Sequence, residues 1–139
     1  MAIRKIPKET KVFHYYNANP ADLRTGDCTY RAMALALNKT WEQVVIGLAI
    51  TAIKTKYSPA DRANLDVYLK EHGWRKMPQP KKNNGKKYTV KEFCESIADC
   101  EKVYYISVAH HCTCVKECKA WDIWDCTGKT VGNYWMKEE

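Results

Sequence analysis

The chain has 139 residues, which is enough for one buried core but not for two, so we predict a single domain over residues 1–139. Apolar residues make up 45% of it and charged residues 28%, which excludes a disordered or collagen-like chain, and no apolar run reaches the ~18 residues of a membrane-spanning helix. The 23 basic and 16 acidic side chains give a net charge of +7, but no aromatic-interleaved basic helix accompanies it, so we expect neither a nucleic acid nor a membrane as the partner.

Helices are predicted for the first two thirds of the chain. Asp27 to Leu37 is rich in Ala and Leu, which favour a helix, and Asn38 is a residue type that commonly ends one. Residues 40–43, Thr-Trp-Glu-Gln, form a capping box in front of the apolar run 44–53. A second helix is therefore predicted to start there.

Two further helices follow from the same kinds of signal. Ser58 and Pro59 offer an N-cap and a proline at the first helical position, and Gly73 is expected to close this third helix. The capping box from Thr89 to Glu92 predicts a fourth helix that ends near Asp99.

The last third of the chain is predicted to form a sheet. Residues 102–109 are rich in Val, Tyr and Ile, and three shorter strands follow at 111–116, 120–125 and 130–136, separated by tight turns. Sequential short strands with turn-length gaps imply an antiparallel sheet. We therefore predict an α+β fold in which N-terminal helices pack on a C-terminal four-stranded antiparallel sheet.

Cys28 is the cysteine whose position suits a nucleophile. It opens the first predicted helix, where unpaired backbone N–H groups and the positive end of the helix dipole stabilise a thiolate. Gly26 is expected to let the chain turn sharply just before it. A half-buried cysteine at an ordinary helix start, capped by Asp27 or Thr25, explains the same pattern, so position alone leaves both interpretations open.

A histidine and a carboxylate that could activate this cysteine come from adjacent predicted strands. If residues 117 and 118 form the centre of the hairpin turn, His111 and Asp122 are diagonal neighbours on one face of the sheet. His110 and Asp125 then pair on the other face. A turn one residue longer or shorter would exchange these partners, so an aspartate lies within reach of a histidine in either register.

Cys28, His111 and Asp122 are the residue types that thiol catalysis requires. The segment Gly-Asp-Cys-Thr-Tyr-Arg-Ala at 26–32, followed by His111 and by Asp-Ile-Trp at 122–124, resembles papain-like cysteine peptidases. In particular it resembles the small, mostly uncharacterised papain-like proteins of bacteriophages and bacterial genomes, over nearly the whole chain. The helix start is also similar to the Asp-Gly-x-Cys motif of ovarian-tumour-type deubiquitinases.

The resemblance implies a papain-like fold and a role for each matching residue. Cys28 would be the nucleophile and His111 the base. Asp122 stands where papain has its orienting asparagine, and Trp124 stands where papain has the tryptophan that shields the histidine–carboxylate bond from water. The resemblance therefore favours His111 with Asp122 over the alternative pair.

The oxyanion donor is where the chain departs from papain. Papain carries a glutamine six residues before its cysteine, whereas this chain has Asp22, and an ionised carboxylate cannot donate a hydrogen bond. We expect the amide of Asn19 or Asn17 to act as the donor, together with the backbone N–H of Cys28.

The expected function is thiol acyl transfer without a cofactor. The enzyme would be a cysteine peptidase or an isopeptidase, the deubiquitinase type included, that cleaves an amide bond in a protein or peptide substrate. We also expect a cytoplasmic protein with reduced cysteines, in the host cytoplasm if a phage encodes it, because the first ten residues lack a secretory apolar segment.

Two alternatives remain from the sequence. One is a papain-like domain without activity that binds or inhibits a host protein or a nucleic acid. The other is a structural zinc module, although no Cys-x-x-Cys pair is present and we predict no metal site. Its candidate ligands are His110, His111, Cys112, Cys114, Cys118 and Cys126.

Overall fold

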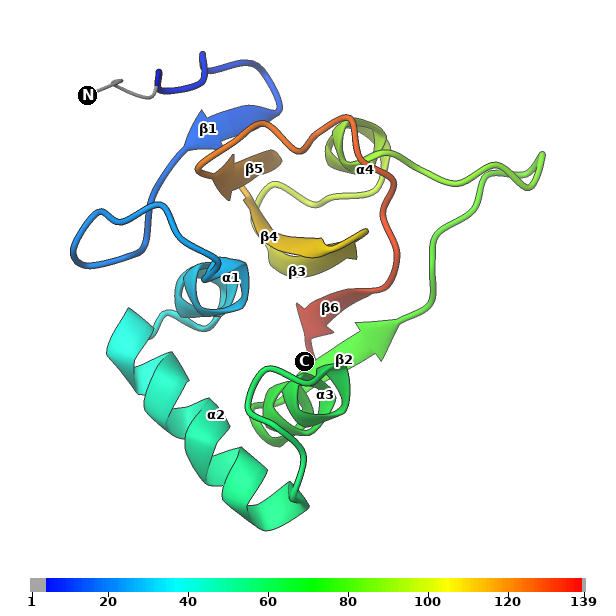
Figure 1. Cartoon of the computed structure of the whole chain (residues 1–139). Helices are drawn as coiled ribbons and strands as arrows, with labels where there is room; N and C mark the ends of the chain where they lie inside the picture. Colours follow the sequence, from blue (N-terminus) through cyan, green and yellow to red (C-terminus); the bar gives the residue numbers. More distant parts are fainter. Residues whose placement is uncertain (1–4, 139) are drawn as a thin grey trace.

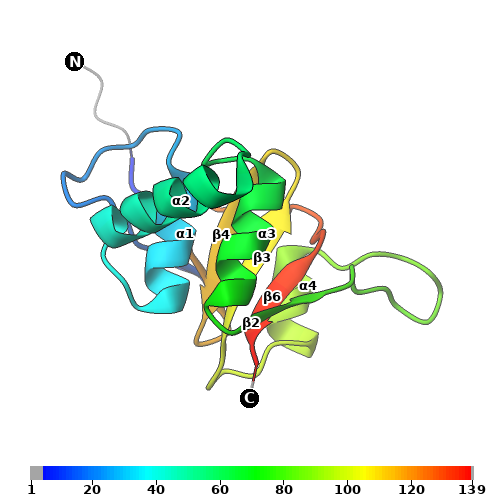
Figure 2. The ribbon, with the colours of Figure 1, turned by 90° about the horizontal axis from the view of Figure 1, so that it is seen from below.

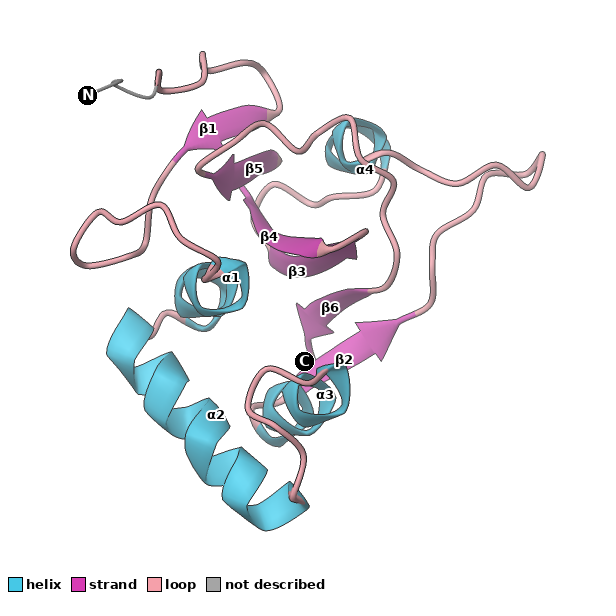
Figure 3. Ribbon diagram, viewed as in Figure 1, coloured by secondary structure: helices cyan, strands magenta, loops and turns pink. Residues whose placement is uncertain are grey.

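Six strands form one sheet, with helices on both of its faces, in the computed structural model (Figures 1 and 3). The structure describes residues 5–138, so the ends of the predicted domain, 1–4 and 139, lie outside the described residues. The elements are β1 (Phe13–Tyr15), α1 (Cys28–Leu37), α2 (Trp41–Thr55), α3 (Arg62–Glu71), β2 (Trp74–Met77), α4 (Val90–Ser96), β3 (Val103–Val108), β4 (His111–Lys116), β5 (Lys119–Asp122) and β6 (Tyr134–Lys137).

The sheet is mixed and has the strand order β1-β5-β4-β3-β6-β2. Each pair of neighbours is antiparallel except β1 and β5, which run parallel. The α+β class is confirmed, but the prediction of four antiparallel strands was wrong, because β1 and β2 add an edge strand on each side. These strands have three and four residues, too few to show a period in the sequence, and they form by pairing with β5 and β6.

The two faces of the sheet are covered by different helices. Figure 2 shows α1, α2 and α3 on one face and α4 on the other. The larger core lies under the first three helices and includes Met33, Leu48, Leu69 and Trp135, while Phe93 of α4 helps to fill the second core. Among residues 5–138, no helix has the combination of length and apolar character that crossing a bilayer requires.

Local signals decide where most helices begin and end. Both predicted capping boxes are present, at Thr40 and at Thr89, and Asn38 adopts the left-handed conformation that ends α1. The third helix differs from its prediction. It starts one turn later, after Asp61, and the backbone N–H of Ser58 donates to the Asp61 carboxylate instead of Ser58 capping the helix.

The hairpin between β4 and β5 has the register that the sequence predicts. Glu117 and Cys118 have φ angles of 55° and 61°, as a two-residue type I′ turn requires. Cys114 pairs with Trp121, as a turn centred on residues 117 and 118 demands. The turn also carries a disulfide between Cys118 and Cys100, which contradicts the expectation that all seven cysteines are reduced.

Candidate active site

Cys28 is the first residue of α1, as predicted, and its side chain is partly exposed. Its backbone N–H belongs to the first turn, where no intrahelical acceptor exists. The reason offered for the sharp turn before it was wrong. Gly26 has no positive φ, and a Cβ atom at this position would meet nothing within 4 Å, so glycine is not required there.

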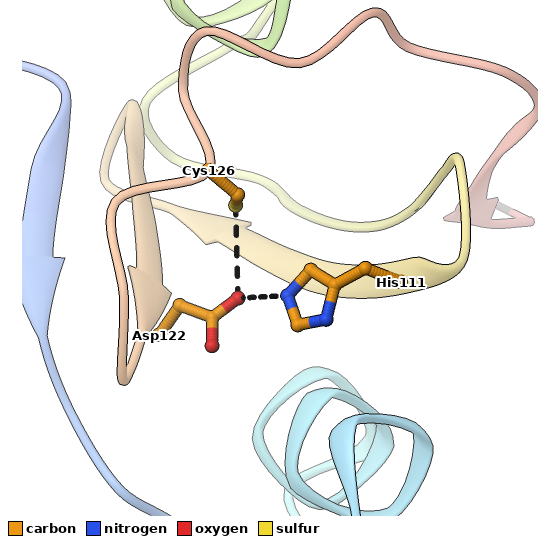
Figure 4. Close-up of side chains that lie close together, drawn as sticks. All are labelled: His111, Asp122 and Cys126. Carbon is orange, nitrogen blue, oxygen red and sulfur yellow. Dashed lines mark hydrogen bonds and ion pairs between the residues drawn. The ribbon is translucent and has the colours of Figure 1, made fainter. Parts of the chain in front are cut away.

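His111 and Asp122 form a buried pair beside the start of α1. His111 Nε2 and Asp122 Oδ2 are 2.6 Å apart, and the two side chains are 9% and 1% exposed. The ring centroids of Trp124 and His111 lie 4.8 Å apart, and Trp124 is 37% exposed. Figure 4 shows the second ring nitrogen of His111 turned away from Asp122, toward α1.

The alternative histidine–aspartate pair does not form. His110 lies in the turn between β3 and β4, where its φ is 56°, and is exposed rather than paired across the sheet. The carboxylate of Asp125 accepts hydrogen bonds from Thr127, two residues along the chain. Of the two registers considered, the structure therefore has the one that joins His111 to Asp122.

The electrostatics of the site favour a thiolate and an imidazolium. The pKa of Cys28 is lowered to about 4, mainly by hydrogen bonding with Cys112. Burial acts in the opposite direction, but a hydrogen bond to His111 and the positive charge of His111 lower the pKa further. Burial disfavours the charged imidazole, but hydrogen bonds to Asp122, Cys126 and Cys28 outweigh it and raise the pKa of His111 to about 11. The two groups are therefore ionised together near neutral pH.

A cavity of about 230 Å³ opens beside the cysteine. Its lining includes the buried side chains of Tyr105, Cys112 and Trp135, and also Arg62 of α3. This volume is below the ~300–1,000 Å³ typical of sites for drug-sized ligands.

The two asparagines expected to donate to an oxyanion are used elsewhere. Asn19 Nδ2 donates to Asp27 Oδ2 at 3.0 Å, and Asn17 Nδ2 donates to the carbonyl of Leu23 at 3.0 Å and to Asp22. Neither asparagine lines the cavity. The structure thus places both amides in the hydrogen bonds of the 17–27 loop.

Arg31 is a site residue that the sequence analysis missed. It lies one turn after Cys28, is 7% exposed, and joins Asp122 to Asp27 by ion pairs of 2.8 Å each. The spacing of three residues was a usable signal, because residues i and i+3 share one face of a helix. An arginine in an otherwise small and apolar segment, Ala-Met-Ala-Leu-Ala, was the other signal.

The candidate ligands of the alternative zinc site do not come together as a single site. Cys118 is in a disulfide and His110 is in an exposed turn. A different group is compact: the ligand atoms of His111, Asp122 and Cys126 lie within 4.8 Å of one another (Figure 4). Two features oppose a metal ion at this group. Burial raises the pKa of Cys126, so its thiol keeps the proton that a metal ion would have to displace. The other oxygen of Asp122 already accepts a hydrogen bond from the positively charged Arg31.

Comparisons with known proteins add no family to these observations. No protein-family model matches the chain, and no curated protein or solved structure matches it either.

Proposed function

We propose that the protein is a thiol acyl-transfer enzyme in which Cys28 attacks an amide carbonyl, His111 exchanges the proton and Asp122 orients His111. The observation that carries the proposal is the buried Asp122–His111 pair, whose second ring nitrogen is turned toward α1, the helix that begins at Cys28. Trp124 against the His111 ring, on a sheet packed under helices, fits the papain-like arrangement that the sequence resembles.

The proposed reaction has two steps. The Cys28 thiolate forms a bond to the carbonyl carbon, His111 gives its proton to the departing amine, and the C–N bond breaks to leave an acyl-enzyme. Water or an amine then attacks the acyl carbon, His111 accepts its proton, and the C–S bond breaks to restore the thiolate. The backbone N–H groups of the first turn of α1 are the donors available to a developing oxyanion.

The proposed substrate is a protein or peptide. A cavity of about 230 Å³, which Cys28 helps to line, accommodates one side chain next to the scissile bond. Its lining combines aromatic residues, Tyr105 and Trp135, with polar ones such as Arg62 and Asn133, a typical composition of binding pockets. A cytoplasmic location remains a prediction. The Cys100–Cys118 disulfide counts against it, because disulfides are rare in the cytosol.

Brief exposure to iodoacetamide at pH 6, read by mass spectrometry, tests the proposal. An ordinary thiol is ionised to well under 1% at this pH, so Cys28 should react on the order of 100-fold faster than the other free cysteines. Its rate should fall as the pH falls through about 4. His111→Ala should abolish the preference, and His72→Ala, which alters a histidine at the end of α3, should keep it.

A second readout separates catalysis from a reactive but inactive site. Wild-type protein incubated with a peptide mixture should generate new amino termini, and Cys28→Ala should generate none. Equal labelling of all free cysteines at pH 6 would defeat the proposal and favour a binding or inhibitor domain.

Metal binding by His111, Asp122 and Cys126 is the second candidate, favoured by their proximity. It predicts stoichiometric zinc in protein purified without added metal, lost in Cys126→Ala. The acyl-transfer proposal instead predicts that Cys126→Ala keeps the fast labelling of Cys28.

A further inference from the structure

The carboxylate that orients His111 is itself held by a second buried charge. Asp122 uses its two oxygens differently: Oδ2 meets His111, while Oδ1 accepts from Arg31 Nη1 at 2.8 Å and from the backbone N–H of Ile123 at 2.7 Å. Oδ1 therefore fixes the plane of the carboxylate, and Oδ2 is left to bind the imidazole of His111.

Arg31 is held in turn from its other side. Its Nε donates to Asp27 Oδ1 at 2.8 Å, and the second oxygen of Asp27 accepts from Asn19 and from Trp41, each at 3.0 Å. Asp27 makes no capping hydrogen bond to the backbone of α1, although it is the residue before Cys28. Its side chain is committed to anchoring Arg31.

The same helix therefore supplies the nucleophile and the anchor of the distant carboxylate. Cys28 and Arg31 are three residues apart in α1, so they lie on one face, and Asp122 ends β5 on the other side of the site. One turn of α1 fixes Cys28 relative to Arg31. Arg31 binds Asp122 and Asp122 binds His111, so this chain of contacts sets the distance from the Cys28 thiol to the His111 imidazole.

We propose that Arg31, anchored by Asp27, is a positioning residue that holds Asp122 in the orientation that directs His111 toward Cys28. This inference rests on the proposed function. The planar guanidinium is needed because two carboxylates are reached through different nitrogens, which a lysine ammonium on a flexible stem cannot match. Other titratable groups that interact with this pair are Cys126, whose sulfur lies 3.6 Å from Asp122 Oδ2, Cys114 on β4, and Cys28 itself.

The test is the pH dependence of Cys28 alkylation in Arg31→Lys. We expect the rate at pH 6 to fall at least about tenfold, which corresponds to a rise in the pKa of the Cys28 thiol from about 4 to about 7, and to approach the wild-type rate near pH 9.5. Arg75→Lys, which changes an exposed arginine of β2, is the matched control and should leave the profile unchanged. Circular dichroism confirms that each variant is folded.

A double-mutant cycle separates positioning from general stability. If Arg31 acts through Asp122, Arg31→Lys should change the rate less than twofold in an Asp122→Asn background, whereas independent structural effects would multiply. Asp27→Asn weakens the anchor of Arg31 without altering Arg31 itself, and it should also lower the alkylation rate of Cys28 at pH 6. This variant tests the positioning role if Arg31→Lys does not fold.

The possible outcomes distinguish the two proposals. Wild-type protein without fast labelling of Cys28 overturns the proposed function. Fast labelling in the wild type that persists in folded Arg31→Lys or Asp27→Asn, or a loss that is equally large with and without Asp122, overturns the role of Arg31 alone.

Discussion

Cys28 shares its surroundings with a second sulfur. Cys112 on β4 lines the same cavity, and its Sγ donates to the Thr29 hydroxyl at 3.6 Å. Hydrogen bonding with Cys112 is the largest cause of the lowered pKa of Cys28, ahead of the contribution of His111. Hydrogen bonding to a charged form favours that form, so the neutral thiol of Cys112 works as a thiolate stabiliser.

Replacement of Cys112 by alanine should therefore raise the pKa of Cys28. The alkylation rate of Cys28 at pH 5 should fall about twofold if the pKa rises by one unit and about tenfold if it rises by two, while the rate near pH 9 stays close to the wild-type value. Cys114→Ala is the matched control, because Cys114 is a buried cysteine two residues along β4. Equal rates for the two variants at pH 5 would mean that His111 alone stabilises the thiolate.

Two elements bring the site together, the helix α1 and the β4–β5 hairpin. The helix presents Cys28 and Arg31 on one face, and the hairpin presents His111 and Asp122 across its open end. The register of the hairpin is set by a tight turn in which both central residues have positive φ. Because side chains alternate along a strand, a shift of one residue would move Asp122 to the opposite face.

Insertion of one glycine between Glu117 and Cys118 tests this dependence. The shifted register should remove the His111–Asp122 hydrogen bond, and the fast labelling of Cys28 at pH 6 should disappear. The control is the same insertion between Asn84 and Gly85, in the exposed loop before α4. Fast labelling in a folded hairpin variant would show that the register does not control the cysteine.

At the scale of the whole molecule, a disulfide ties the hairpin turn to the connection between α4 and β3. It joins Cys100 and Cys118, which are 18 residues apart, at the sheet end away from His111. Closing a loop of this length stabilises a fold by about 3 kcal/mol in the chain-entropy description. The disulfide is therefore expected to support the fold and not the chemistry.

Counting thiols tests the disulfide directly. Protein denatured without reductant should show five free thiols, and reduced protein should show all seven. The Cys100→Ser, Cys118→Ser double variant should lose about 2–4 kcal/mol in the free energy of unfolding. Its Cys28 labelling at 25 °C should match the wild type, and seven thiols without reductant would contradict the pairing.

Much of the α1 and hairpin geometry could be predicted from the sequence, because it depends on neighbouring residues. The capping boxes at Thr40 and Thr89 and the helix end at Asn38 are local hydrogen-bonding patterns. If the hairpin turn has two residues, the alternation of strands predicts the pairing of His111 with Asp122, and the resemblance favoured this pair over His110 with Asp125. These features need no knowledge of distant segments.

The tertiary structure decided what depends on distant parts of the chain. Edge strands β1 and β2 exist only because β5 and β6 offer them unpaired backbone groups, and Cys100 meets Cys118 only once α4 and the hairpin have packed. Arg31 can be buried because two carboxylates, four and 91 residues away, neutralise it. Sequence alone thus determined which residues could do thiol chemistry, while long-range packing determined which charges hold them in place.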